Sequence, residues 1–199
     1  MTIFNLPNIL TIGRILMTPF FIICLFYDHP WAKSWALFIF AVASITDAYD
    51  GYLARKNDQV TEAGKFLDPL ADKILVSSAF ISFAVMGVVE YWMVALIIFR
   101  DLFVTGLRIV MSHKGFIMIT STIAKAKTII QISIIIFILL FLGLKALNLE
   151  PLKFILHLIV QYHFIYVLTL ITTIFTVITG IAYLTTNRGA IKQFLAANQ

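Results

Sequence analysis

Apolar residues occur along this chain in long runs that short polar segments separate. Each run is close to the roughly 20 residues that a helix needs to cross the hydrocarbon core of a bilayer. The pattern predicts six helical spans, with Gly189 ending the last of them. The first two spans cover residues 9–26 and 31–45, and the second continues as a helix into the polar stretch that follows. The third begins before residue 72 and ends at 89. The last three cover 92–111, 123–144 and 156–184.

The composition agrees with a membrane protein. The 199 residues are 61% hydrophobic and 13% charged, against about 25% charged residues in a soluble domain. The runs are too long for the strands of a membrane barrel, which take about 9–11 residues. We therefore expect an all-α, polytopic membrane protein, with one domain over residues 1–199 that forms a six-transmembrane-helix bundle.

Basic residues predict how this bundle is oriented. Lysine and arginine are enriched in the cytoplasmic flanks of membrane spans. One set of flanks holds ten basic residues and the other set holds three. The ten are Arg14, Arg55, Lys56, Lys65, Arg108, Lys114, Lys125, Lys127, Arg188 and Lys192, and the three are Lys33, Lys145 and Lys153. We expect a multi-pass protein of the cell (inner) membrane, with both termini on the cytoplasmic side.

The segment 47–72 holds six of the ten acidic residues. Asp47 and Asp50 are three residues apart and Asp68 and Asp72 are four apart, so on helices each pair shares one face. A short loop joins the two halves. We therefore expect antiparallel helices whose four carboxylates meet at the cytoplasmic end of the bundle.

Four carboxylates at such a place would repel one another, and each costs roughly 2.5–3.5 kcal/mol at membrane depth. The cluster makes sense with cations inside it, and oxygen ligands favour hard divalent ions such as Mg²⁺, Mn²⁺ or Ca²⁺. Two ions are plausible, because a two-metal site can hold both oxygens of a phosphoryl displacement. The alternative, that these are ordinary charges at the end of a span, explains one aspartate more readily than four in helical register.

The residues of this segment form a spaced pattern: Asp47, Asp50-Gly51, Ala54-Arg55, Gly64, Asp68 and Asp72. The pattern resembles the signature of the CDP-alcohol phosphotransferase family at each fixed position. The resemblance implies six helices, a homodimer, and transfer of a phosphatidyl group from a CDP-linked lipid to an alcohol, with release of CMP. It also implies that the four aspartates bind two Mg²⁺ or Mn²⁺ ions, that Asp72 is the general base, and that Gly51, Ala54, Arg55 and Gly64 shape the CDP pocket.

The acceptor alcohol is predicted from basic residues elsewhere. Arg100 lies well inside the fourth run, and Arg108, Lys125 and Lys127 lie nearer the cytoplasmic end. Two arginines and two lysines near one metal cluster suggest a phosphate-bearing acceptor. The alternative for Arg100 is a structural ion pair with Asp101 or Asp47.

Four segments resemble the branch of the family that uses glycerol-3-phosphate: NLPNILTIGRI, GKFLDPLADKIL, RDLFVTGLR and AKAKTIIQ. This chain departs from the branch at Asp101, where glutamate is common, and at Ala124, where glycine is common. The motif-bearing part is 1–131, and 132–199 is expected to be scaffold helices. The acceptor could instead be inositol phosphate, serine or phosphatidylglycerol. In a different class of protein, the same aspartates could serve a divalent-cation transporter.

Overall fold

The computed structural model describes residues 6–56, 62–116, 118 and 122–196. Throughout these ranges the regular structure is helical and contains no strand, so the predicted all-α class is confirmed. The helices are α1 (Leu6–Phe26), α2 (Ala32–Lys56), α3 (Glu62–Val85), α4 (Tyr91–His113), α5 (Thr122–Leu147), α6 (Lys153–Gln161), α7 (Phe164–Thr186) and α8 (Arg188–Ala196), with a short 3-10 helix η1 (Glu150–Leu152) before α6.

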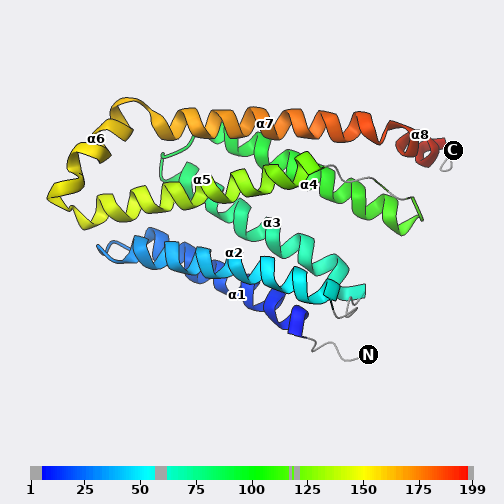
Figure 1. The fold of residues 1–199 in the computed structure, drawn as a ribbon, viewed down its shortest axis with the longest axis horizontal. Coiled ribbons are helices and arrows are strands. Elements are labelled where there is room, and N and C mark those ends of the chain that lie inside the picture. The colour runs from blue at the N-terminus through cyan, green and yellow to red at the C-terminus, as the bar shows by residue number, and fades with distance from the viewer. Residues whose placement is uncertain (1–5, 57–61, 117, 119–121, 197–199) are drawn as a thin grey trace.

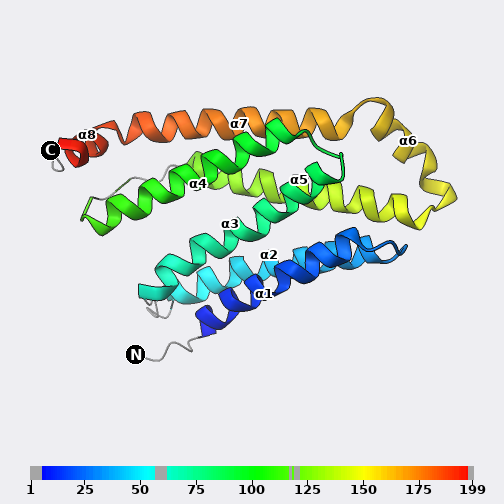
Figure 2. The ribbon, with the colours of Figure 1, turned by 180° about the vertical axis from the view of Figure 1, so that it is seen from behind.

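The long helices α1, α2, α3, α4, α5 and α7 run back and forth along the molecule, as Figures 1 and 2 show. α1 packs against α2 and α3, α5 against α2 and α7, and α4 against α7 and α3. The start of α1, the end of α2, the start of α3 and α8 lie at one end of the molecule, and the α1–α2 turn and α6 lie at the other (Figure 1). The ends of α2 and α3 that carry the aspartates are therefore at the same end as α8.

Two of the described helices are long and apolar enough to cross a membrane, over Ala126–Leu147 in α5 and Phe164–Thr186 in α7. Shorter apolar helical stretches cover Thr11–Phe26 and Lys73–Val85. Large apolar side chains are also exposed along the outer faces of other helices, including Phe20, Trp35 and Phe99. An apolar surface of this extent is typical of contact with lipid. These helices and the apolar surface agree with the expected membrane protein, and the count of six spans stays a prediction.

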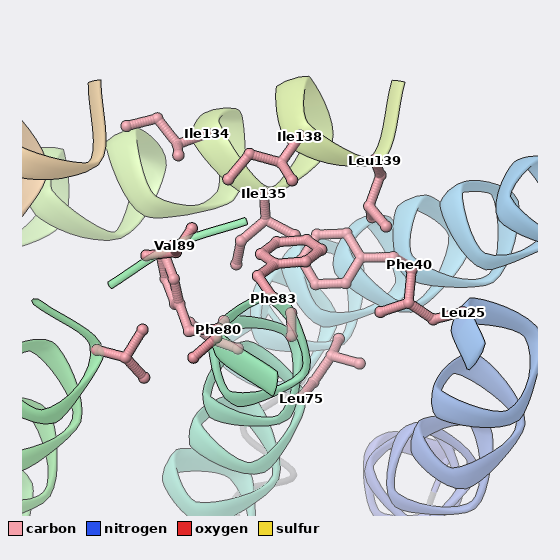
Figure 3. Packing of buried hydrophobic residues seen from close by; sticks show 14 of the residues in the cluster. Leu25, Phe40, Leu75, Phe80, Phe83, Val89, Ile134, Ile135, Ile138 and Leu139 are labelled. Atoms are coloured by element: carbon pink, nitrogen blue, oxygen red, sulfur yellow. The ribbon is translucent and has the colours of Figure 1, made fainter. Parts of the chain in front are cut away.

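The apolar core joins α1, α2, α3, α4 and α5, and Figure 3 shows part of it. Phe40 of α2 packs against Phe21 of α1 with ring centroids 5.7 Å apart. Figure 3 shows Phe80 and Phe83 of α3 below Ile135 and Ile138 of α5. This core fixes α2 and α3 relative to their neighbours, and both helices continue from it toward the aspartate segment.

The sixth predicted span, 156–184, is wrong as one continuous helix. The chain leaves helical geometry at Tyr162 and His163, and His163 takes the left-handed conformation with φ 49°. α6 ends there and crosses from the end of α5 to the start of α7 (Figure 1). A change of direction is needed because α5 and α7 pack against each other.

The prediction that Gly189 ends the last span is also wrong. α7 ends at Thr186, and Asn187 closes it by donating from its side-chain amide to the carbonyl oxygen of Tyr183 at 2.9 Å. Gly189 lies inside α8. Two glycines of the described residues have left-handed backbones, Gly87 (φ 69°) and Gly115 (φ 80°). Gly87 ends α3, where the Val88 amide donates to the Phe83 carbonyl oxygen at 2.9 Å.

Candidate active site

The four aspartates of the predicted metal site all lie on helices. Asp47 and Asp50 are on α2, and Asp68 and Asp72 are on α3. Helical geometry over both segments gives each pair a shared face, as the spacing predicts. Figures 1 and 2 show α2 and α3 close together near their connection and diverging away from it. The fold therefore brings the backbone of both pairs to one end of the molecule.

Asp47 is the member of this set whose side chain the structure describes. It forms an ion pair with Arg14 of α1. The side chains of Asp50, Asp68 and Asp72 lie outside the described residues, and so do those of the expected CDP pocket, which are Gly51, Ala54, Arg55 and Gly64. Their roles stay predictions. The donor set itself, four carboxylates on two adjacent helix ends, fits hard divalent cations.

Arg14 is a residue of the site that sequence reasoning missed. It was counted only among the basic flanks that set orientation, but its side chain is 1% exposed, while that of Asp47 is 35% exposed. Thr18 donates from its hydroxyl to the Arg14 carbonyl oxygen at 3.0 Å. A buried arginine needs a negative partner, and Arg14 meets that need at Asp47. A lone arginine eight residues into an apolar helix was the signal that could have revealed it.

A second charged cluster is built around Asp101 of α4. Its Oδ1 accepts from Lys127 Nζ at 2.5 Å and from Arg100 Nη1 at 3.2 Å, and its Oδ2 accepts from Gln131 Nε2 at 3.2 Å. The side chains of Asp101, Lys127 and Arg100 are only 3%, 2% and 12% exposed. Lys127 and Arg100 thus face the single carboxylate of Asp101. Positive charge therefore exceeds negative charge here, as an anion site requires.

The predicted acceptor residues divide into two places. Arg100 and Lys127 meet at Asp101. Arg108 lies elsewhere on α4, with its guanidinium carbon 5.6 Å from the ring centroid of Tyr183 and its Nε 3.5 Å from the Tyr183 hydroxyl. The side chain of Lys125 lies outside the described residues. The Arg100–Asp101 ion pair, which the sequence offered as an alternative, is present, and acceptor binding by these four residues stays a prediction.

α7 contributes to this region in a way that the sequence did not suggest. Its apolar run was expected to be scaffold, yet its buried side chains are mostly hydroxyl-bearing. They are Thr169, Thr172, Thr173, Thr176, Thr179 and Tyr183, together with Gly180. The periodic threonines in the printed run ITTIFTVITG were the available signal.

Comparison with known proteins identifies the family of this chain. The sequence model of the CDP-alcohol phosphatidyltransferase family matches residues 4–182, which is most of the chain. The chain therefore belongs to the CDP-alcohol phosphatidyltransferase family. The matched region extends from the N-terminal segment through most of α7 and includes both charged clusters.

Several relatives are similar over most of their length. The chain is 37% identical over 201 residues to the CDP-diacylglycerol--glycerol-3-phosphate 3-phosphatidyltransferase of Bacillus subtilis, covering 95% of this chain and 98% of the relative. A Rickettsia bellii protein of the same name is 37% identical over 179 residues, covering 90% and 93%. A probable phosphatidylglycerophosphate synthase of Mycobacterium tuberculosis is 45% identical over 130 residues, covering 64% and 62%.

Proposed function

We propose that the protein transfers the phosphatidyl group of CDP-diacylglycerol to glycerol-3-phosphate, giving phosphatidylglycerophosphate and CMP. The observation that carries the proposal is the pattern of four aspartates on α2 and α3, in a chain that matches the family over residues 4–182. The names of the Bacillus and Rickettsia relatives support the donor and the acceptor.

The reaction forms one phosphorus–oxygen bond and breaks another. A hydroxyl oxygen of glycerol-3-phosphate attacks the lipid-side phosphorus of CDP-diacylglycerol, and the bond to the CMP phosphate oxygen breaks. Asp72 accepts the proton of the attacking hydroxyl as general base. Gly51, Ala54, Arg55 and Gly64 shape the pocket for the cytidine and the pyrophosphate.

Asp47, Asp50, Asp68 and Asp72 would hold two divalent ions, Mg²⁺ or Mn²⁺. When bound, such ions neutralise pyrophosphate charge and stabilise the leaving CMP. Arg14 supports this arrangement, because its ion pair orients the Asp47 carboxylate from the side of α1. The protein's own contribution is therefore to orient the donor and to keep the four carboxylates near one another.

The acceptor phosphate is bound by Arg100 and Lys127, with Arg108 and Lys125 nearer the cytoplasmic end. Asp101 supports this assignment, because its carboxylate holds both buried cations before an anion arrives, and Gln131 orients that carboxylate by donating to its other oxygen. Cationic side chains that are already ordered bind a phosphate with a smaller loss of conformational entropy. The excess positive charge of the cluster favours a phosphate-bearing alcohol over serine.

We further propose a six-span arrangement in the cell membrane, with both termini and the active site on the cytoplasmic side, and a homodimer. The ten basic residues counted on one set of flanks support this orientation. Such a site lies where a membrane lipid and a soluble phosphate ester can both reach it.

Competition between acceptors tests the proposed function. Purified protein is given CDP-diacylglycerol, Mg²⁺ and radiolabelled glycerol-3-phosphate, and unlabelled inositol phosphate, serine or phosphatidylglycerol is added in excess. We expect label in the lipid product, with little competition from the other alcohols. Absence of labelled lipid, together with CMP release on adding another alcohol, would assign a different acceptor. Metal flux into proteoliposomes without CMP release would instead indicate a transporter.

A further inference from the structure

Gly180 of α7 lies directly against the side chain of Arg100. A Cβ atom at position 180 would lie 2.9 Å from Arg100 Cγ and 3.3 Å from Arg100 Nε. The first of these distances is shorter than real Cβ contacts allow. The clash would be with the stem of Arg100 rather than its far end, so relief requires the arginine to shift. The absence of a side chain at this position therefore sets where the guanidinium lies.

The guanidinium of Arg100 is bonded on one side only. Nη1 donates to Asp101 Oδ1 at 3.2 Å, whereas Nε and Nη2 are buried and have no hydrogen-bond partner among the described residues. In an arginine, Nε and Nη2 lie along one edge of the guanidinium. This edge can donate two parallel N–H hydrogen bonds to a carboxylate or a phosphate. Buried donors without a partner are costly and uncommon, so this edge is suited to a bound anion.

Two further buried polar atoms are also without a partner in the described part of the chain. They are Gln131 Oε1, whose amide nitrogen bonds Asp101, and Thr176 Oγ1. Thr176 lies one turn before Gly180 on the same face of α7. The other four buried threonines of α7 donate to backbone carbonyl oxygens, with distances of 2.8–2.9 Å. Thr176, one turn from the residue that contacts Arg100, thus lacks the backbone hydrogen bond that the other four threonines make.

We propose that Gly180 is a positioning residue for acceptor binding. It leaves the space in which Arg100 lies against α7, with Nη1 held by Asp101 and the Nε–Nη2 edge open to the acceptor phosphate. α7 then forms one wall of the acceptor site, and Thr176 lines that wall. This inference rests on the proposed function, in which Arg100 binds the phosphate of glycerol-3-phosphate.

The test is the steady-state kinetics of Gly180→Ala, with both substrates varied. Displacing the guanidinium weakens its charge-assisted hydrogen bonds to the phosphate, so we expect the KM for glycerol-3-phosphate to rise about tenfold or more. The KM for CDP-diacylglycerol and kcat at saturating acceptor should stay unchanged. Gly143→Ala is the matched control, because its added Cβ would meet Ser34 Oγ at an ordinary 3.5 Å in another helix contact.

A double-mutant cycle with Arg100→Ala shows whether Gly180 acts through Arg100. In the Arg100→Ala background, Gly180→Ala should cause no further rise in the KM for glycerol-3-phosphate. The inference is overturned if Gly180→Ala changes kcat and both KM values together, or if it lowers folded yield while Gly143→Ala does not. Either result assigns Gly180 a structural role.

The same cycle separates this inference from the proposed function. If Arg100→Ala leaves the KM for glycerol-3-phosphate unchanged, then Arg100 is not an acceptor ligand and the assignment on which the inference rests fails. If Arg100→Ala raises that KM and Gly180→Ala does not, only the positioning role is lost.

Discussion

Arg14, Asp101 and Lys127 are charged side chains buried in a largely apolar protein. Arg14 pairs with Asp47, and Lys127 pairs with Asp101. Removing one partner of a buried pair leaves an uncompensated charge, which is more costly than removing both. At the scale of single residues, each of these ion pairs therefore affects both the stability of the protein and the position of the charged side chains in its cluster.

Asp101→Asn tests this connection. The substitution leaves Arg100 and Lys127 without a negative partner, and we expect the free energy of unfolding to fall by about 3–5 kcal/mol. The measurement is thermal unfolding of the purified protein in detergent. In Asp101→Asn with Lys127→Met, part of the loss should be recovered because one unpaired charge is gone.

The exposed pair of Glu150 and Lys153 serves as the control for that experiment. Glu150→Gln should leave the unfolding temperature almost unchanged, since exposed ion pairs contribute little. An Asp101→Asn protein that unfolds at the temperature of the unmodified protein would show that the buried pair does not stabilise the fold.

Asp72→Asn tests the assignment of the general base. The amide cannot accept the proton of the attacking hydroxyl, so we expect kcat to fall by about 100- to 10,000-fold. Binding of CDP-diacylglycerol, measured as thermal stabilisation by the donor, should be largely kept. A fully active Asp72→Asn enzyme would disprove the assignment.

At the scale of elements, the apolar pattern predicted the long helices well because each carries enough apolar residues to be recognised without its neighbours. It also predicted that α2 continues in helical register through Asp47 and Asp50 to Lys56. The break at His163 was not predictable, because no glycine or proline lies between residues 152 and 179 to mark it. It follows from the packing of α7 against α5, which is a tertiary property.

The candidate site was predictable to a similar degree. The spacing of the aspartates follows from the sequence. Arg100 and Lys127 were also identified from the sequence, and their proximity to the four aspartates stays a prediction. Their common partner Asp101 had been considered only for Arg100, and Gln131 was not expected there. Contacts between helices depend on how each helix is rotated, which a single sequence does not specify. The approach of Gly180 to Arg100 is of the same kind.

Two glycine substitutions test the helix ends. Gly87 has φ 69° and its Cβ would meet open space, so Gly87→Ala carries backbone strain alone and should cost about 1–2 kcal/mol of stability. Gly189 lies in α8 and is equally open, so Gly189→Ala should be neutral or slightly stabilising. Thermal unfolding of both variants is the measurement, and a destabilised Gly189→Ala protein would restore the prediction that Gly189 ends a helix.

At the scale of the whole molecule, the alternation of helices places the connections in two groups at opposite ends (Figure 1). The aspartate-bearing ends of α2 and α3 share one end with α8, and the α1–α2 turn and α6 share the other. If α8 is cytoplasmic, the aspartates are cytoplasmic too, because they lie at the same end.

Cysteine labelling tests this orientation. Cys24 is the single cysteine of the chain, so Cys24→Ser provides a background without thiols. Exposed positions at the two ends, Asp28 and Gln193, are then replaced by cysteine one at a time. In intact protoplasts, a membrane-impermeant maleimide should label Asp28→Cys directly and Gln193→Cys only after permeabilisation. The reverse pattern would place the aspartates outside the cell.

The most direct test of the whole account is CMP release by the purified protein. The protein is incubated with CDP-diacylglycerol, with Mg²⁺ or Mn²⁺, and with glycerol-3-phosphate, inositol phosphate, serine or phosphatidylglycerol in turn. We predict CMP release with glycerol-3-phosphate and its loss when a chelator removes the divalent ion. Release with another alcohol but not with glycerol-3-phosphate, or no release with any of them, would contradict the account.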